Sequence, residues 1–281
     1  MFSCILRSCD ETDQSSTDAT KDEVKTKIAL ERLVDTLMKP EDVKQRYEIQ
    51  ETIGKGGFGV VSKVRDLTTG ALYAMKKLPF DSDGKCNENL KREIFNIIKM
   101  RSHDNIVHWH DIFRTHENQL VIVMDLCNMD LDTFLKSHEN RTVDILFDVA
   151  LQITAGIAFL HTHNPPVIHR DIKPQNILIK IDAATKKIVV KIADFGLSNT
   201  GDFNQIIDST TKEDFAKIDR FLKTTRHGSG TRPFLAPEFF AAFHGQGLTD
   251  GRFRVDASVD IFALGLVFAY MFLFNTNDFG E

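Results

Sequence analysis

A cluster of glycines could lay backbone N–H groups over phosphate oxygens. It consists of Gly54, Lys55, Gly56, Gly57, Phe58 and Gly59, with the spacing G-x-G-x-x-G. In a dinucleotide-binding fold such glycines open a helix, and an acidic residue follows about 20 positions later. Here they lead into a β-branched run that starts at Val60 and ends in a turn, which argues against that fold. A strand-glycine-strand hairpin over phosphates fits better, and a plain flexible hairpin is the alternative.

The run Ala74-Met75-Lys76 could also serve a phosphate ligand. Strand alternation places Ala74 and Lys76 on one face. The small alanine leaves room there for a purine ring, and the lysine reaches phosphate oxygens. A lysine that points into a cleft needs an anionic partner, which Glu93 can supply. Taken alone, Lys76 could equally be a surface lysine on an edge strand and Glu93 a solvated helix charge.

The segment Ile168–Leu178, with the sequence IHRDIKPQNIL, is the most informative stretch of the chain. It resembles the catalytic loop H-R-D-L-x-x-x-N of protein kinases, with isoleucine in place of leucine. Asp194-Phe195-Gly196 and Ala236-Pro237-Glu238 follow in the order that this family has. The resemblance extends from about Tyr47 to the C-terminus. It is far more specific than any one of these motifs alone.

The resemblance implies a role for each residue of the nucleotide site. The glycines Gly54, Gly56 and Gly59 are expected to cover the phosphates of ATP. Lys76 is expected to hold the α- and β-phosphates, oriented by Glu93.

The segment Val121–Cys127 resembles the hinge of the family. The backbone groups of Asp125 and Cys127 are then implied to bond adenine, and Met124 to close the rear of the pocket. The side chains implied to sandwich the purine are those of Val61, Ala74 and Leu178.

The resemblance likewise assigns the catalytic and metal residues. Asp171 is implied to accept the proton of the incoming hydroxyl, and Lys173 to neutralise charge on the γ-phosphate. Asn176 and Asp194 are implied to hold Mg²⁺, a hard cation that prefers oxygen ligands. Phosphoryl transfer depends mainly on positioning and countercharge, so these residue types suit the reaction.

Two further residues are implied to support the catalytic loop. His169 is expected to be a packed residue in contact with Phe195 and not a general base. Asp260 resembles the buried aspartate that anchors the catalytic loop in this family.

The acceptor and the regulation follow from the same resemblance. Lys173 and Thr231 are typical of serine/threonine kinases, and protein substrates are the expected partners. Arg170 is expected to receive a phosphate carried by the activation segment. An activating kinase, or a second copy of the chain acting in trans, would add it. The expected phosphorylation site is Thr224, Thr225 or Ser229.

The elements that must position these residues change in character along the chain. Strand patterns dominate at first, and helical patterns follow Asp132. The strands are expected at Tyr47–Ile53, Val60–Leu67, Leu72–Leu78, Val107–Arg114, Leu120–Leu126, Ile177–Lys180 and Val189–Ala193. The helices are expected at Asn87–Met100 and Thr142–Thr162. The fold class is therefore α+β, with a small antiparallel β lobe, a larger mainly α lobe, and a cleft between them for a small ligand.

The predicted domain organisation has two parts. Residues 1–46 form an N-terminal extension, partly disordered, in which residues 23–39 have helical spacing. Residues 47–281 form the kinase domain, with lobes at 47–127 and 128–281. The second lobe is expected to lack its final helices, because the chain stops soon after the apolar run Ile261–Phe274. That run would then expose an apolar face.

The composition limits the classes of partner and cellular location that the protein could have. The net charge of −5 argues against nucleic acid as the main partner. None of the four cysteines forms a C-x-x-C pair, which favours free thiols and a cytoplasmic location. No signal peptide is visible, and the strongest apolar run, the charge-free segment Ile261–Phe274, is short for a membrane span. The expected protein is therefore a cytoplasmic enzyme without a membrane span.

Two alternatives to an active protein kinase stay open. One is a catalytically impaired, kinase-like scaffold that binds nucleotide or partner proteins. The other is a small-molecule kinase of related fold, against which the APE motif argues. The subfamily is not defined. The segment Lys173–Ile179 is loosely similar to the unfolded-protein-response kinase/endoribonucleases, and the glycine cluster to the translation-initiation-factor kinases.

Overall fold

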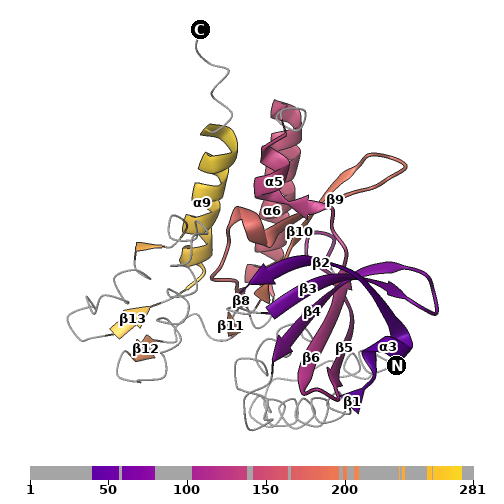
Figure 1. The fold of residues 1–281 in the computed structure, drawn as a ribbon. Helices are drawn as coiled ribbons and strands as arrows, with labels where there is room; N and C mark the ends of the chain where they lie inside the picture. The colour runs from indigo at the N-terminus through magenta and orange to yellow at the C-terminus, as the bar shows by residue number, and fades with distance from the viewer. Residues whose placement is uncertain are drawn as a thin grey trace, which may run out of the picture. The chain divides into compact units, whose positions relative to one another are not determined.

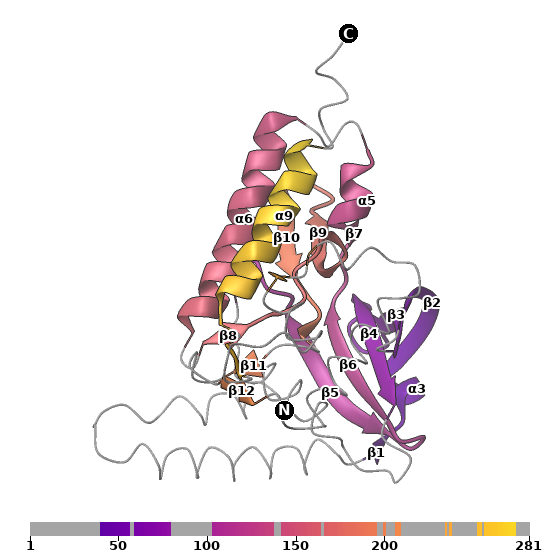
Figure 2. The ribbon, with the colours of Figure 1, turned by 90° about the vertical axis from the view of Figure 1, so that its left-hand side faces the viewer.

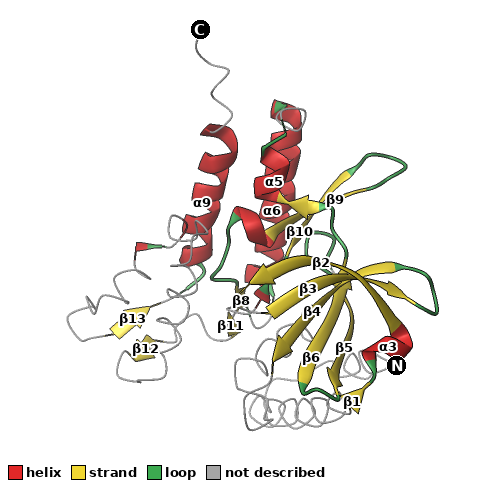
Figure 3. Ribbon diagram, viewed as in Figure 1, coloured by secondary structure: helices red, strands yellow, loops and turns green. Residues whose placement is uncertain are grey.

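The fold comes from a computed structural model. It describes residues 40–56, 59–79, 103–137, 142–163, 166–195, 199–200, 206–208, 234, 236–237, 252–254 and 256–273. The chain separates into two compact units. These are Met1–Arg101 with His108–Leu126, and Ser102–Val107 with Cys127–Glu281. Strands predominate in the described part of the first unit and helices in that of the second (Figure 3).

The first unit is built on a six-stranded sheet in the order β1-β5-β6-β4-β3-β2 (Figure 1). Its strands are β1 (Pro40–Glu41), β2 (Tyr47–Gly56), β3 (Gly59–Asp66), β4 (Leu72–Pro79), β5 (Trp109–Thr115) and β6 (Gln119–Asp125). All neighbouring pairs are antiparallel except β1 and β5, which are parallel. The five strands expected in this region are confirmed, with ends that shift by a few residues. The largest shift is in β2, which continues into the glycine cluster.

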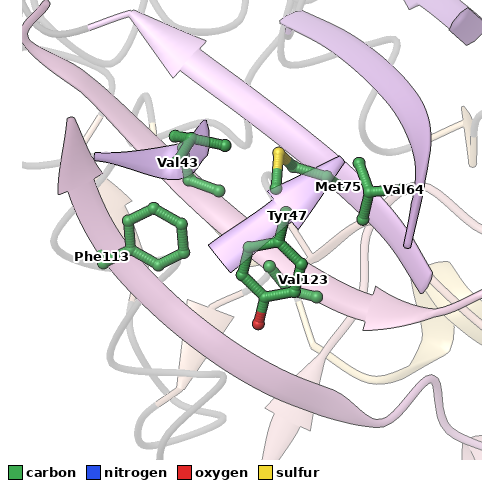
Figure 4. Packing of buried hydrophobic residues seen from close by; sticks show 7 residues of the cluster. Val43, Tyr47, Val64, Met75, Phe113 and Val123 are labelled. Carbon is green, nitrogen blue, oxygen red and sulfur yellow. The ribbon is translucent and has the colours of Figure 1, made fainter. Parts of the chain in front are cut away.

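One face of this sheet carries a buried hydrophobic cluster (Figure 4). Its members are Val43, Tyr47, Val64, Met75, Phe113, Val121 and Val123. The short helix α3 (Val43–Arg46), capped by the Asp42 side chain, supplies Val43. Because Met75 faces this cluster, alternation along β4 turns Ala74 and Lys76 toward the opposite face.

The second unit contains the helices α5 (Leu131–Leu135), α6 (Val143–Thr162) and α9 (Ser258–Leu273). The oxygen Oγ1 of Thr142 accepts the N–H of Ile145 and so caps the start of α6. The helical period places Leu146, Ala150, Ile153, Ile157 and Leu160 along one side of α6, and all five are buried. The helices α6 and α9 lie side by side (Figures 1 and 2).

Three short sheets lie in the described part of the second unit. The largest, β10-β9-β7, joins β7 (Met129–Asp130), β9 (Ile177–Ile181) and β10 (Ile188–Ile192). The strand β8 (Val167–Ile168) pairs with β11 (Asn199–Thr200), and β12 (Ile206–Asp208) pairs with β13 (Arg252–Arg254). The Gln152 side chain of α6 accepts the N–H of Val190 and donates to the carbonyl of Ile188. The Gln152 side chain therefore holds β10 against α6. The neighbouring strand, β9, directly follows the catalytic loop in the sequence.

Among the described helices, α6 is long and apolar enough to cross a membrane by length and composition. This is weak support for a span, because the core helix of a soluble domain passes the same test. The buried stripe of α6 fits such a core helix. The helices expected at 23–39 and 87–100 lie outside the described residues.

Candidate active site

The glycine cluster lies where β2 and β3 meet. Lys55 pairs with Val60 and Gly56 with Gly59, while Gly57 and Phe58 lie outside the described residues. Gly59 has φ +125°, and a Cβ there would lie 2.1 Å from the carbonyl oxygen of Lys77 in β4. Glycine is therefore required at this position by the neighbouring strand, whether or not a phosphate approaches.

Gly54 differs from Gly59, because nothing blocks a side chain there. The nearest atom to a Cβ built on Gly54 would be Cβ of Val61, at 3.6 Å. The fold of the described residues does not require this glycine, so its expected role in covering a ligand stays a prediction.

The face of the sheet opposite the buried cluster holds the expected nucleotide residues. Lys76 is 7% exposed and pairs with Val61 and Ile122, while Ala74 pairs with Met124. Paired residues share a face, so the first unit brings Val61, Ala74, Lys76 and Met124 together on one face of the sheet. Glu93, the expected partner of Lys76, lies outside the described residues.

One backbone hydrogen bond limits which group of Asp125 could bond adenine at the expected hinge. The Asp125 N–H donates to the carbonyl of His108 at 3.0 Å. Of the backbone groups of Asp125, its carbonyl is therefore the one that could accept from a base. Cys127 and Leu178, both half-buried, belong to the second unit.

The catalytic loop brings three of the expected residues into contact. The Nδ2 of Asn176 donates to both the backbone carbonyl and the Oδ2 of Asp171, each at 2.8 Å. The Nζ of Lys173 donates to the same Oδ2 at 2.8 Å. The short 3₁₀ helix Pro174–Asn176 makes this possible, because it returns the chain toward Asp171.

The electrostatic surroundings of Asp171 set its pKa. Burial raises the pKa of this carboxyl above its usual value, the charge of Lys173 and its hydrogen bond only partly offset that rise, and Asp194 adds to it. Asp171 is 5% exposed. A carboxylate with a raised pKa is a stronger proton acceptor than an ordinary aspartate.

Asp260 holds the backbone of the catalytic loop from α9. Its Oδ2 accepts the N–H of His169 and its Oδ1 the N–H of Arg170, both at 2.7 Å. Arg170 has φ +67°, a conformation that is uncommon outside glycine, and these bonds help to stabilise it. Asp260 is fully buried, as the sequence led us to expect.

A third donor to Asp260 was not anticipated from the sequence. The Nε2 of His161, in the last turn of α6, lies 2.8 Å from Oδ2 of Asp260. A histidine at a helix end ordinarily suggests an interaction with the last carbonyls of that helix. The sequence carries no signal that would have paired it with a residue so far along the chain.

His169 is packed, as expected, and both of its ring nitrogens are engaged. Nδ1 faces the N–H of Asp171 at 3.3 Å, so Nε2 carries the hydrogen and donates to the carbonyl of Ala193 at 3.0 Å. The ring contacts Phe195 at a centroid distance of 5.0 Å, and both side chains are fully buried. His169 thus joins the catalytic loop to the Asp194 segment.

Asn176 and Asp194 are the expected metal ligands. Since Nδ2 of Asn176 donates to Asp171, its amide oxygen is the atom that suits a hard cation. Asp194 has φ +66° and is half-buried. The described residues contain no group of three or more His, Cys, Asp or Glu arranged to hold a metal. Mg²⁺ is usually bound by one or two protein oxygens plus substrate phosphates and water.

Comparison with known proteins agrees with these features. Residues 47–279 match the protein kinase domain family, so the chain belongs to that family. Its members generally use ATP and Mg²⁺. The chain is also 30% identical over 245 residues to the serine/threonine-protein kinase tousled-like 2 of Xenopus tropicalis. That match covers 85% of this chain and 32% of the relative, so the chain spans about a third of the relative's length. The expectation of a eukaryotic-type serine/threonine kinase family is confirmed, and its subfamily is open.

Proposed function

We propose that this chain transfers the γ-phosphoryl group of ATP to serine or threonine hydroxyls of protein substrates. The proposal rests above all on Asp171, a buried carboxylate held by Asn176 and Lys173 on a loop that Asp260 anchors. A catalytically silent scaffold is less favoured, because none of the core catalytic positions is substituted.

Asp171 is the proposed proton acceptor. Its Oδ2 accepts from both Lys173 and Asn176, which leaves Oδ1 as the oxygen suited to the substrate hydroxyl. The carboxylate is thereby fixed in orientation before substrate arrives, which lowers the entropic cost of reaching the reactive geometry. Lys173 would turn its ammonium group toward the γ-phosphate once the nucleotide is bound.

The phosphates and the metal ion are assigned to the residues that the kinase motifs identify. We assign Lys76 to the α- and β-phosphates, with Glu93 as its partner, and the backbone of Gly54–Gly59 to covering them. Asn176 and Asp194 would hold Mg²⁺, which when bound neutralises charge on the phosphate oxygens. We assign adenine to the backbone groups of Asp125 and Cys127 and to the side chains of Val61, Ala74 and Leu178.

We propose the regulation, the cellular location and the class of partner from the sequence. Phosphorylation at Thr224, Thr225 or Ser229, which lie outside the described residues, would supply the anion for Arg170. An activating kinase or a second copy acting in trans could add it. The absence of C-x-x-C pairs in the sequence favours the cytosol, and the net charge of −5 disfavours a nucleic-acid partner.

The decisive experiment is transfer of labelled γ-phosphate to a generic serine/threonine protein substrate. Wild type should label the substrate on serine or threonine, whereas Asp171→Asn should lose the signal because the amide cannot accept the proton. Glu117→Gln, an exposed carboxyl in the turn between β5 and β6, is the control and should keep wild-type activity. Equal labelling by wild type and Asp171→Asn would reveal a contaminating kinase and refute the proposal.

A further inference from the structure

Two histidines, His108 just before β5 and His110 within it, lie close to Asp125, the last residue of β6. The Nε2 of His110 lies 3.0 Å from Oδ1 of Asp125. The backbone N–H of His108 reaches the other carboxylate oxygen of Asp125 at 3.4 Å. The two imidazole rings meet edge to face, with centroids 4.8 Å apart. The proposed function uses the backbone of Asp125, and it uses neither the side chain of Asp125 nor the two histidines.

A β-bulge explains why His110 reaches Asp125. Trp109 pairs with Met124 and Asp111 with Val123, so β5 has one residue more than β6 between these pairs. His110 is that extra residue. A bulge bends the strand and redirects the side chain at its centre, and bulges are frequent beside active sites. Here the side chain of His110 is brought to the end of β6 where the hinge begins.

A third ring supports His110 from β4. The Tyr73 and His110 rings have centroids 4.5 Å apart and are tilted by 50°. Tyr73 itself packs against the buried cluster of the first unit. Among the residues that the structure describes, the titratable groups in contact with His110 are therefore Asp125, His108 and Tyr73. His110 is 30% exposed and Asp125 12% exposed, so the pair is partly shielded from water.

Asp125 is held at three points by this arrangement. Its N–H donates to the carbonyl of His108, and its two carboxylate oxygens accept from His110 and from the N–H of His108. These bonds hold the Cα of Asp125, from which the hinge carbonyl projects, and so restrict the positions and directions that this carbonyl can take. Hydrogen bonds weaken steeply when donor and acceptor are misaligned, so this direction matters for any base bonded to that carbonyl.

We propose that His110 is a positioning residue for the nucleotide. Through Asp125 it orients the hinge carbonyl and thereby sets the affinity for the adenine of ATP and ADP. The inference rests on the proposed function for the identity of the ligand. His110 touches neither the nucleotide nor the substrate in this proposal, so its removal should weaken nucleotide binding and spare the chemical step. A pre-oriented carbonyl binds more tightly because less ordering is needed on binding.

The test uses two substitutions that separate the hydrogen bond from the ring. His110→Phe keeps a ring beside Tyr73 and removes the donor to Asp125. His110→Gln restores an N–H donor without the ring. His116→Phe, an exposed histidine in the turn that follows β5, is the matched control. The measurements are the Kd for MgADP by calorimetry, the KM for ATP, kcat, and the KM for a protein substrate.

His110→Phe should raise the Kd for MgADP and the KM for ATP by about tenfold, the factor that matches loss of one charge-assisted hydrogen bond. Its kcat and its KM for protein substrate should stay close to wild type, because only binding shared by ground and transition states is lost. His110→Gln should recover most of the nucleotide affinity, and His116→Phe should match wild type. An unchanged Kd for MgADP in His110→Phe would overturn the proposal. So would a loss of folding stability without a change in affinity, which a purely structural role predicts.

A double-mutant cycle keeps the test decisive if one variant folds poorly. Asp125→Ala removes the partner of His110, so adding His110→Phe to it should weaken MgADP binding no further. Additive effects of the two substitutions would refute the coupling. If wild type binds MgADP and transfers no phosphate, the proposed function fails while the Kd series still decides the role of His110.

Discussion

The Oδ2 of Asp260, in α9, accepts the backbone N–H of His169 at 2.7 Å, although the two residues are far apart in sequence. The same carboxylate accepts from Arg170 and from His161. We predict that Asp260→Asn destabilises the protein by about 3 kcal/mol, because an amide can accept at one oxygen only and turns an N–H donor toward other donors. Denaturant unfolding measures this loss.

The control for Asp260→Asn is Asp144→Asn, at an exposed carboxyl in the first turn of α6. It should change stability by only a few tenths of a kcal/mol, through the helix dipole. The kcat of Asp260→Asn should also fall, because the loop that carries Asp171 loses its anchor. Equal stability of the two variants would contradict the anchoring role.

The pH dependence of the reaction should shift when Lys173 is replaced. The base works as a carboxylate, and burial raises the pKa of Asp171, so kcat/KM should fall as pH drops through that raised pKa. Lys173 is the largest influence that lowers this pKa. Lys173→Met should therefore raise the pKa of Asp171 further and move the acid limb of the pH–rate profile to higher pH, as well as reducing kcat.

Full pH–rate profiles of wild type, Lys173→Met and Lys187→Met test this shift. Lys187 is an exposed lysine between β9 and β10, and its replacement should leave the acid limb in place. A profile of Lys173→Met that is lower at every pH but unshifted would mean that Lys173 does not influence the ionisation of Asp171.

Local patterns predicted most of the elements that carry the site. Period-two alternation placed Ala74 and Lys76 on one face of β4, and the helical period of α6 identified its buried stripe. These features depend on neighbouring residues, so the sequence contains the whole signal. The asparagine and lysine around Asp171 were recognised through the motif, and a one-turn 3₁₀ helix accounts for their contact.

Contacts between distant segments could not be predicted in the same way. The bond between His161 and Asp260 depends on how α6 packs against α9. The position of His110 depends on a β-bulge that no residue type in β5 predicts. The glycine cluster shows a different limit. The sequence suggested close approach of a phosphate, while at Gly59 the closest group is the carbonyl of Lys77 in the next strand.

This distinction between glycines predicts different results for two substitutions in the cluster. Gly59→Ala should cost about 2 kcal/mol of stability, because its φ of +125° and the carbonyl of Lys77 at 2.1 Å both oppose a side chain. Gly54→Ala should leave stability almost unchanged and affect only the KM for ATP. Unfolding in denaturant and steady-state kinetics on both variants separate the two effects. Equal losses of stability would show that the strand packing described for Gly59 is not what requires glycine.

Two helical glycines provide a further matched pair. A Cβ on Gly156 of α6 would lie 2.6 Å from Cδ1 of Ile192 and 3.0 Å from the carbonyl oxygen of Asn105, whereas one on Gly265 of α9 would meet nothing within 4 Å. Alanine favours a helix over glycine by about 1 kcal/mol. Gly265→Ala should therefore stabilise the protein by up to about 1 kcal/mol.

In Gly156→Ala the same helical gain is opposed by overpacking, which costs about 1–3 kcal/mol in a close-packed core. The carbonyl of Asn105 cannot yield easily, because it also accepts the N–H of Ile192. We therefore expect a net loss of stability in Gly156→Ala and a gain in Gly265→Ala, measured by denaturant unfolding under identical conditions. If both variants were stabilised, α6 would have to lie farther from β10 than the structure places it.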